Sequence, residues 1–182
     1  AEAPMSWILV GKNGRRFMNE YDPYMQDTGH RGMDRVDPSQ MGQPFVPCYM
    51  ILDDEARQLY PLGQTMFNDG DYENYEWSQD NLKEVQNGLV RKADTLEELA
   101  EMIGCPVEEL TSTVANWNKS CDAGVDELGR PPKSMVPMRQ APFYLAEVWP
   151  VVSNTQGGPV HDEKRRVVNC LLYTSPSPRD CQ

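Results

Sequence analysis

Residues 93–124 read ADTLEELAEMIGCPVEELTSTVANWNKSCDAG, and they predict two consecutive amphipathic helices. Thr95 followed by Glu98 forms a capping box, a common start signal of a helix. Gly104 supplies the matching stop, because glycine tolerates the left-handed conformation that ends many helices. Between these signals the apolar side chains share one helical face: Leu96, Leu99, Ala100 and Ile103.

The second helix of the pair is predicted to begin at Pro106, which suits a first helical turn. Glu108 and Glu109 follow and complement the positive end of the helix. The apolar stripe consists of Val107, Leu110, Val114 and Trp117. Both helices therefore carry one face for a shared core.

Strand signals flank the helix pair. Gly11–Gly14 contains an Asn-Gly step, which favours a tight hairpin turn between two short strands. A short helix is predicted at 54–57, directly after a strand that ends at Asp53. The runs with strand character are 7–10, 16–18, 48–52, 143–152 and 165–168. This order predicts an α+β fold rather than a regular series of βαβ units.

Two segments lack a regular period. Residues 21–47 are rich in Asp, Gly, Pro and Met, and we interpret them as a long ordered loop of the kind that often carries function. Residues 66–82 are polar and aromatic, and we expect them to be irregular.

Composition limits the class of protein. The chain has 182 residues, of which 39% are hydrophobic, enough for one ordinary domain with a core. A formal net charge of -11 argues against nucleic acid as a partner, because phosphate backbones need a basic face. No apolar run is long enough to span a bilayer. Cys48, Cys105 and Cys121 have no metal-binding spacing, so we expect no metal site.

The composition changes abruptly at Cys170, where the chain continues as CLLYTSPSPRDCQ. Residues 170–180 resemble the translated reading frame of a transposon-type adapter used to prepare DNA sequencing libraries. We therefore expect 170–182 to be a non-native tail and the remaining chain to be an internal fragment, and we leave the tail out of fold reasoning.

Several blocks occur in an order and spacing that resemble one flavoprotein family, the fumarate reductases, urocanate reductases and 3-ketosteroid dehydrogenases. The Arg-Phe-x-Asn-Glu block at 16–20 and the Thr-x-Gly-Gly block at 155–158 are the most specific. The full set is Ile8–Val10, Gly14–Glu20, Ala93–Ala100, Asp126 with Gly129–Arg130, Pro142–Tyr144 and Thr155–Gly158.

The resemblance implies FAD as cofactor and a substrate-capping domain inserted into a Rossmann-like FAD domain. On this basis 1–153 is the capping domain and 154–169 begins the return into the FAD domain. No Gly-x-Gly-x-x-Gly fingerprint is present, so the dinucleotide fold itself is expected elsewhere. Relatives occur in the bacterial cytoplasm and periplasm, and the electron donor stays open.

The resemblance also implies an activity: reduction of a carbon–carbon double bond beside a carboxylate or carbonyl, as in a fumarate-like enoate. The alternative is 3-ketosteroid-type dehydrogenation, the same chemistry in reverse on a 3-keto steroid or a similar apolar ring ketone. A second alternative, for the isolated chain, is an inactive capping module.

Site residues follow from the same resemblance. Thr155, Gly157 and Gly158 match the segment beside the flavin, where missing side chains let backbone approach a ring. Asn154 stands where soluble fumarate reductases have a histidine that contacts a substrate carboxylate. An amide can hydrogen-bond that group but supplies no positive charge.

The proton donor has two candidates. Counting from the block at 16–20, the catalytic arginine of fumarate reductases falls on Tyr24, and a tyrosine is the acid or base expected in steroid-type relatives. A small shift of the loop would instead bring Arg31 to that place, with His30 as a nearby titrating, substrate-binding group. Arg16, Asn19 and Glu20 are expected to hold the loop rather than to react.

Overall fold

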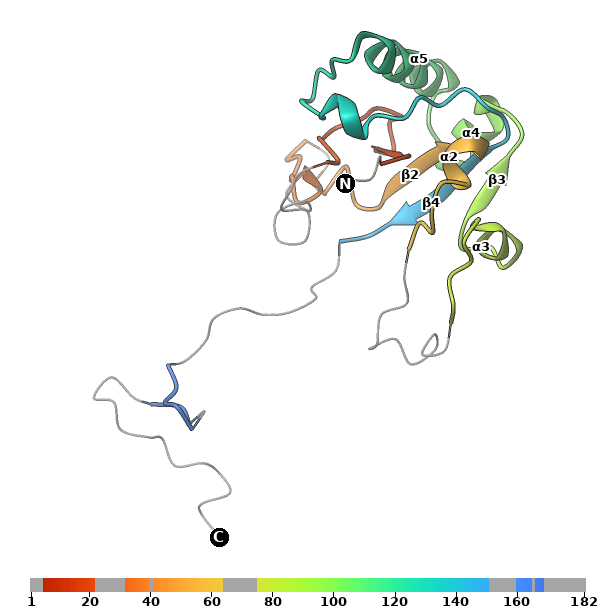
Figure 1. Cartoon of the computed structure of the whole chain (residues 1–182). Coiled ribbons are helices and arrows are strands. Elements are labelled where there is room, and N and C mark those ends of the chain that lie inside the picture. Colours follow the sequence, from red (N-terminus) through yellow and green to blue (C-terminus); the bar gives the residue numbers. More distant parts are fainter. Residues whose placement is uncertain are drawn as a thin grey trace. The chain divides into compact units, whose positions relative to one another are not determined.

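The computed structural model describes residues 5–21, 32–39, 41–63, 75–150, 160–164 and 166–168. Contacts divide the chain into two units, Ala1–Pro150 and Val151–Gln182. Every helix and strand found in the described residues belongs to the first unit (Figure 1). In the second unit the described residues form one antiparallel bridge, between His161 and Val167.

The first unit is built on a four-stranded antiparallel sheet with the order β1-β2-β4-β3. The strands are β1 (Ile8–Val10), β2 (Cys48–Asp53), β3 (Arg91–Ala93) and β4 (Phe143–Val148). Ile51 of β2 lies opposite Ile8 on one side and Leu145 on the other. All three side chains are fully buried, so this register centres the sheet on the core.

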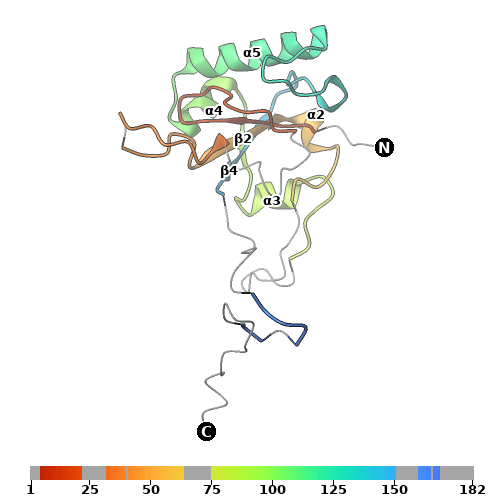
Figure 2. The same cartoon turned by 90° about the vertical axis from the view of Figure 1, so that its left-hand side faces the viewer.

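One face of the sheet is covered by α4 (Leu96–Ile103) and α5 (Val107–Ala123), as Figure 2 shows. The capping box is present: Thr95 Oγ1 accepts a hydrogen bond from the Glu98 amide at 3.2 Å. The Glu98 carboxylate reaches back to the Asp94 amide at 2.7 Å. Gly104 ends α4 with φ +79°, and Pro106 stands directly before α5. The predicted helix pair is confirmed.

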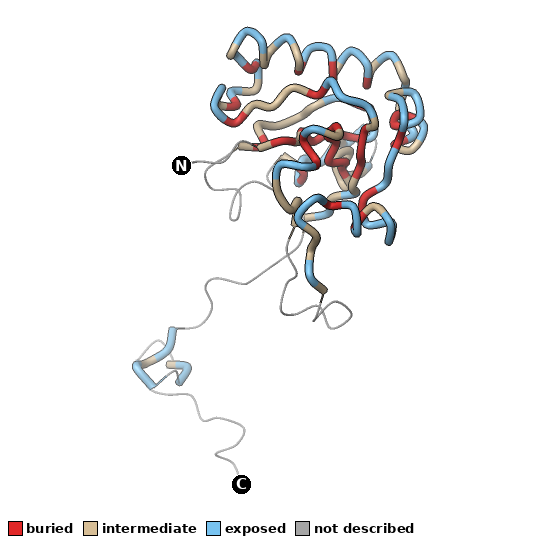
Figure 3. The backbone as a smooth tube through the Cα atoms, turned by 45° about the vertical axis from the view of Figure 1, so that its right-hand side comes forward, coloured by how far each residue is buried: buried red, intermediate tan, exposed pale blue. Residues whose placement is uncertain are grey.

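The main core lies between this helix pair and the sheet. Its buried side chains come from both layers, and Figure 3 shows buried backbone stretches gathered along the sheet. The members are Ile8, Val10, Tyr49, Ile51, Ala93, Leu99, Ala100, Ile103, Leu110, Val114, Trp117, Met138, Phe143 and Leu145. Leu110, Val114 and Trp117 are three of the four residues of the predicted stripe on α5.

The opposite face of the sheet is partly covered by the chain that follows residue 31. Met33 packs with Leu9, Cys48 and Met50 in a second cluster. Phe17 and Phe45 stack beside it, with ring centroids 4.1 Å apart and planes within 6°. Apart from a single 3-10 position at Gly32, residues 32–39 and 41–47 contain no α-helix or named strand, which agrees with the predicted irregular loop over this described part.

Two short helices accompany this second face. Asp53 caps α2 (Asp54–Arg57) by accepting from the Ala56 amide at 2.9 Å, as the strand-to-helix pattern predicts. The other helix, α3 (Leu82–Gln86), follows the buried Asn81.

Asn81 adopts φ +60°, and its side chain contacts both residues 57–62 and residue 77. Its amide nitrogen donates to the carbonyls of Arg57 at 2.7 Å and Tyr60 at 2.9 Å. Its amide oxygen accepts from the Leu62 backbone at 2.8 Å and from the Trp77 indole at 2.6 Å. The Asn81 side chain therefore holds residues 57–62 and residue 77 at one point.

Three predicted boundaries differ from the structure. The second strand of the hairpin is reduced to one bridge, Val10 with Arg16, because Arg16 turns into a buried ion cluster. β4 ends at Val148, and the run at 165–168 contributes only to the bridge described above.

None of the described helices is both long enough and apolar enough to cross a membrane.

Candidate functional site

All of the site residues predicted from the sequence lie outside the described residues. These are Tyr24, His30, Arg31, Asn154, Thr155, Gly157 and Gly158. The structure does place the chain on both sides of 22–31, up to Tyr21 and again from Gly32. The part of the candidate site that the structure describes is therefore the set of contacts made by residues 16–21, directly before this segment.

A buried cluster of four charges holds that approach. Arg16 forms two hydrogen bonds with the Glu20 carboxylate, at 2.9 and 2.7 Å, and two with Asp126, at 2.6 and 3.2 Å. Glu20 also accepts from the Leu9 amide of β1 at 3.1 Å and from Arg130 at 3.3 Å. Two cations face two anions, so the charges balance within the cluster.

Arg130 extends the cluster into the backbone. Its guanidinium donates to the carbonyl of Trp7 at 2.8 Å, to that of Met5, and to Ser134. Arg130 is only 2% exposed and Glu20 is fully buried. Because an unpaired charge is costly at such burial, the many contacts of this arginine are what make the arrangement tolerable.

Trp117 of α5 completes the cluster from the helical side. The guanidinium carbons of Arg16 and Arg130 lie 4.5 and 4.8 Å from the centroid of its ring, a cation–π geometry. The indole nitrogen donates to the Val136 carbonyl at 2.8 Å. The cluster thus joins β1, residues 16–20, α5 and residues 126–136.

The electrostatics of the cluster follow from competition between burial and pairing. Burial alone would raise the pKa of Asp126, but hydrogen bonds and charge from Arg16 outweigh it, and the net pKa is lowered. Burial likewise opposes charge on Arg16, yet its bonds to Glu20 and Asp126 leave its pKa raised. For Arg130 burial prevails and the pKa is lowered, although arginine stays protonated in proteins.

Asn19 lies between the cluster and the segment that follows. Its amide oxygen accepts from the Tyr21 backbone at 2.9 Å, and its amide nitrogen donates to the Gly129 carbonyl at 3.1 Å. Arg16, Asn19 and Glu20 all make contacts within the described residues, and their predicted role in holding the loop stays a prediction, because residues 22–31 lie outside the described part of the chain. The sequence had marked these three residues as one block, without indicating that they contact Asp126 and Gly129.

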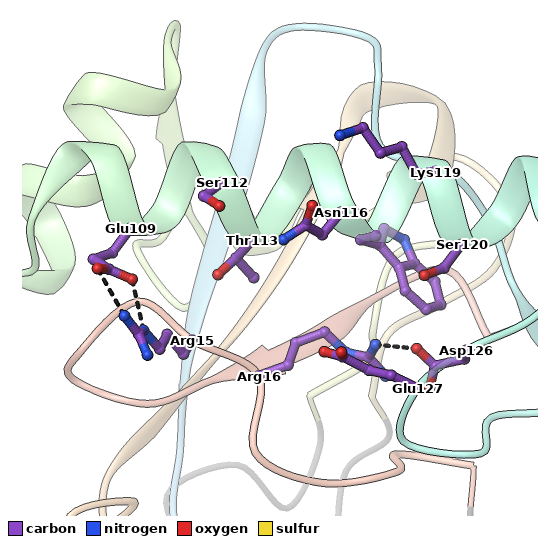
Figure 4. Close-up of a pocket in the computed structure, with 11 residues that line it drawn as sticks. Arg15, Arg16, Glu109, Ser112, Thr113, Asn116, Lys119, Ser120, Asp126 and Glu127 are labelled. Atoms are coloured by element: carbon purple, nitrogen blue, oxygen red, sulfur yellow. Dashed lines mark hydrogen bonds and ion pairs between the residues drawn. The ribbon is translucent and has the colours of Figure 1, made fainter.

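A polar pocket of about 550 Å³ lies against the outer side of this cluster (Figure 4). At one end Arg15 pairs with Glu109 at 2.6 and 2.8 Å, and at the other Arg16 pairs with Asp126. Between them α5 contributes the small polar side chains Ser112, Thr113, Asn116 and Ser120. Both arginines in this lining are already paired with carboxylates. The lining therefore offers hydrogen-bonding groups to a ligand, but neither arginine is left to neutralise a negative charge on it.

A second pocket, of about 750 Å³, is formed partly by the chain that returns after residue 31. Lys12, Arg35 and Phe45 line it together with Asp37. The lining of this pocket thus combines two cations, one carboxylate and an aromatic ring. Within the part of the chain that the structure describes, no group of three or more metal-ligating side chains gathers.

The described residues do not fit the dinucleotide part of FAD. A dinucleotide fold needs parallel strands with a glycine-rich turn before a helix, whereas the sheet is antiparallel throughout. The cofactor contacts that the sequence resemblance assigns to Thr155, Gly157 and Gly158 lie outside the described residues and stay a prediction.

Comparisons with known proteins identify the family. Residues 4–173 match the model described as "FAD binding domain". The NADH:acrylate oxidoreductase of Vibrio harveyi is 34% identical over 91% of this chain and 14% of its own length. The fumarate reductase (cytochrome) of Shewanella frigidimarina is 28% identical over 93% of this chain and 25% of its own length.

A steroid enzyme is similar as well. The 3-oxosteroid 1-dehydrogenase of Mycolicibacterium smegmatis is 28% identical over 88% of this chain and 30% of its own length. The chain thus spans less than a third of each of these relatives.

Solved structures show the same fold. The 3-ketosteroid delta1-dehydrogenase of Sterolibacterium denitrificans aligns with a TM-score of 0.62 at 23% identity, over 93% of this chain and 31% of that one. A flavocytochrome c3 fumarate reductase aligns with a TM-score of 0.63 at 21% identity, over 93% and 25%. The mixed α and β character and the flavoprotein resemblance predicted from the sequence are confirmed. The chain belongs to the FAD binding domain family, and it is similar to fumarate reductase, acrylate oxidoreductase and 3-oxosteroid dehydrogenase enzymes.

Proposed function

We propose that this chain is part of a longer FAD-dependent oxidoreductase that reduces the carbon–carbon double bond of an α,β-unsaturated carboxylate. The observation that carries the proposal is the match to the FAD-binding family over residues 4–173, together with 34% identity to an acrylate oxidoreductase. Residues 1–153 would then be the substrate-capping domain, 154–169 would begin the return into the FAD domain, and 170–182 would be non-native.

Reduced FAD, when bound, would supply the hydride in this chemistry, and the chain's own residues would supply the proton and the orientation. Tyr24 or Arg31 donates a proton to the carbon beside the carbonyl as negative charge develops there. Asn154 donates a hydrogen bond to the substrate oxygen, and His30 is a second substrate-binding group. The proposal is supported by the fixed positions of Asn19 and Glu20 directly before this segment: Glu20 accepts from the Leu9 amide, and Asn19 donates to the Gly129 carbonyl.

The test uses the longer protein with reduced flavin and a panel of acrylate, fumarate, urocanate and cinnamate. The expected result is oxidation of the flavin by at least one enoate. Tyr24→Phe or Arg31→Gln should abolish turnover, while Tyr60→Phe, which removes a hydroxyl that accepts from the Ser6 amide, should not. Failure of every enoate to oxidise the flavin would show the proposal to be wrong.

A second candidate is dehydrogenation of a 3-ketosteroid or similar ring ketone. It is favoured by the M. smegmatis relative and by a tyrosine, rather than an arginine, at position 24. A steroid-induced change in the flavin spectrum that disappears in Tyr24→Phe would support it. A flavin spectrum unchanged by steroid would count against it.

For the isolated chain we propose an inactive module. The antiparallel sheet of the described residues gives no dinucleotide-binding fold, so the purified 182-residue chain should carry no flavin absorbance. A yellow preparation whose flavin stays bound during dialysis would contradict this.

A further inference from the structure

Two Asn-Gly steps occur in the sequence, at 13–14 and 87–88, and the fold gives them the same local geometry. In each step the asparagine Oδ1 accepts from the backbone amide two residues ahead, at 3.1 Å for Asn13 and 3.2 Å for Asn87. Each glycine amide donates to the carbonyl three residues before it, at 2.9 Å in the first step and 3.3 Å in the second. Both glycines have positive φ, +75° and +83°. The two steps therefore form a matched pair.

An Asn-Gly step can modify itself, because the glycine nitrogen can attack the side-chain carbonyl carbon of the asparagine. The nitrogen gives its proton to a base, the N–Cγ bond forms, the Cγ–Nδ2 bond breaks, and the leaving nitrogen takes up a proton and departs as ammonia. Water then opens the succinimide ring at either carbonyl and gives aspartate or isoaspartate. The net reaction exchanges ammonia for water and transfers no electrons. Glycine favours the attack because it has no Cβ to shield its nitrogen.

The attack requires the peptide unit between asparagine and glycine to leave its turn. In both steps the glycine nitrogen is bonded to a carbonyl, so this bond must break before the nitrogen can approach Cγ. Asn87, for example, has φ -91° and ψ 0°, and its ψ must change for the ring to close. The rate at each step therefore depends on how easily its turn opens locally.

The turn at Asn13 is closed by packing. Gly14 is buried, and a Cβ placed on it would lie 3.0 Å from Cys105 Sγ and 3.3 Å from the backbone nitrogen of Leu110 in α5. The ends of the turn are joined by the Gly11 amide, which donates to the Arg15 carbonyl at 3.0 Å. Rotation of this peptide unit would push Gly14 against α5 and break the hairpin.

The turn at Asn87, which ends α3, is open (Figure 1). Asn87, Gly88 and Leu89 are exposed, and among the described residues no atom beyond the chain neighbours comes within 4 Å of a Cβ placed on Gly88. The Asn87 Nδ2 donates to the Tyr75 hydroxyl at 2.8 Å, a bond that must break before ammonia leaves. One hydrogen bond at an exposed site slows such a step by at most about tenfold. The peptide unit at Asn87 is thus the easier one to rotate.

We propose that Asn87 is a site of spontaneous succinimide formation and hydrolysis in the folded chain, whereas the fold protects Asn13. The product carboxylate can accept hydrogen bonds but can no longer donate to the Tyr75 hydroxyl, which itself donates to the buried Glu84 at 2.6 Å. The new negative charge also stands at the C-terminal end of α3, where the helix dipole disfavours it. Modification therefore weakens the contacts that hold the end of α3.

The experiment follows both asparagines in one sample. The 182-residue chain is incubated in mildly alkaline buffer, once folded and once in urea above its unfolding midpoint. Portions are stopped with acid and digested, and the peptides that contain Asn13 and Asn87 are measured for the mass increase from amide to acid. Chromatography separates the aspartate and isoaspartate products. Asn87→Gln, which should lose the signal of the second peptide and leave the first unchanged, verifies the assignment.

In the folded chain, Asn87 should convert at least about tenfold faster than Asn13, because only its turn opens without disturbing packed atoms. In urea the two rates should agree within about twofold, since the unfolded chain has lost both turns. Equal rates in the folded chain, or a faster reaction at Asn13, would overturn the inference. An Asn87 that stays unmodified while the unfolded chain reacts would also overturn it. A difference that persists in urea would do the same, because the neighbouring residues and not the fold would then be its cause.

Discussion

Replacing Glu20 by glutamine removes one charge from the buried cluster while keeping the shape of the side chain. The carboxylate of Glu20 accepts four hydrogen bonds: from the Leu9 amide at 3.1 Å, from Arg16 at 2.9 and 2.7 Å, and from Arg130 at 3.3 Å. A glutamine would turn an N–H group toward at least one of these donors. The Arg130 guanidinium would also lose its carboxylate partner, because Asp126 pairs with Arg16.

The size of the effect follows from burial. The side chains of Glu20 and Arg130 are fully buried and that of Arg16 is 7% exposed, so water cannot replace the lost charge. Breaking a buried ion pair by removing one partner costs about 3–5 kcal/mol. For a domain of this size that corresponds to a fall in Tm of roughly 6–20 °C.

The assay is urea unfolding of the 182-residue chain, followed by the far-ultraviolet circular dichroism of α4 and α5. Glu109→Gln is the control, because Glu109 makes the same two-bond contact with an arginine at an exposed site. Exposed pairs contribute little, so Glu109→Gln should leave the midpoint almost unchanged. A Glu20→Gln midpoint equal to that of the control would refute the reasoning.

Three further outcomes are expected. The pKa of Asp126 is lowered because bonds from Arg16 outweigh burial, so its contribution is present above the unfolded pKa of about 3.9 and is lost as pH falls through the lower folded value; the urea midpoint should drop below about pH 4, and less so in Asp126→Asn. Gly14→Ala should lower the midpoint more than Gly124→Ala, because both have positive φ but only at Gly14 would the new methyl lie 3.0 Å from a sulfur atom and 3.3 Å from a backbone nitrogen; equal midpoints would argue against crowding. Burial raises the pKa of Cys48 to about 12, so iodoacetamide at about pH 8 should label it, by peptide mass spectrometry, only after unfolding; labelling of the folded chain would count against the buried position.

The elements predicted correctly are those specified by neighbouring residues. The helix pair depends on Thr95, Glu98 and Gly104, whose signals act within a few positions. The junction of β2 and α2 likewise depends on Asp53, which ends the strand and caps the helix. Such local contacts can be inferred from sequence because both partners lie in one short window.

The elements that were missed depend on distant partners. β3 contains the exposed Arg91 and Lys92 and has no alternation of apolar residues; it is a strand because it pairs with β4. α3 follows Asn81 in a left-handed conformation, an unusual start that the buried contacts of Asn81 and Glu84 stabilise. Neither signal is visible from propensity.

The same reason explains the limits at the candidate site. Arg16 and Asp126 are 110 residues apart, and the sequence placed them in separate blocks without indicating that they meet. The resemblance to flavoproteins singled out these positions, whereas their pairing required the fold. The roles of Tyr24, Arg31 and Asn154 stay predictions, as do those of His30, Thr155, Gly157 and Gly158.

The side chain of Asn81 has a consequence for protein engineering. It accepts hydrogen bonds from Leu62, which precedes residues 64–74, and from Trp77, which follows them. The described residues on the two sides of 64–74 are therefore held near each other by one side chain. The entropy of closing a loop between fixed ends grows slowly, by about 0.6 kcal/mol for each doubling of its length. A change in the number of residues between Gly63 and Tyr75 should therefore add little closure entropy, as long as the contacts of Asn81 with Leu62 and Trp77 are kept.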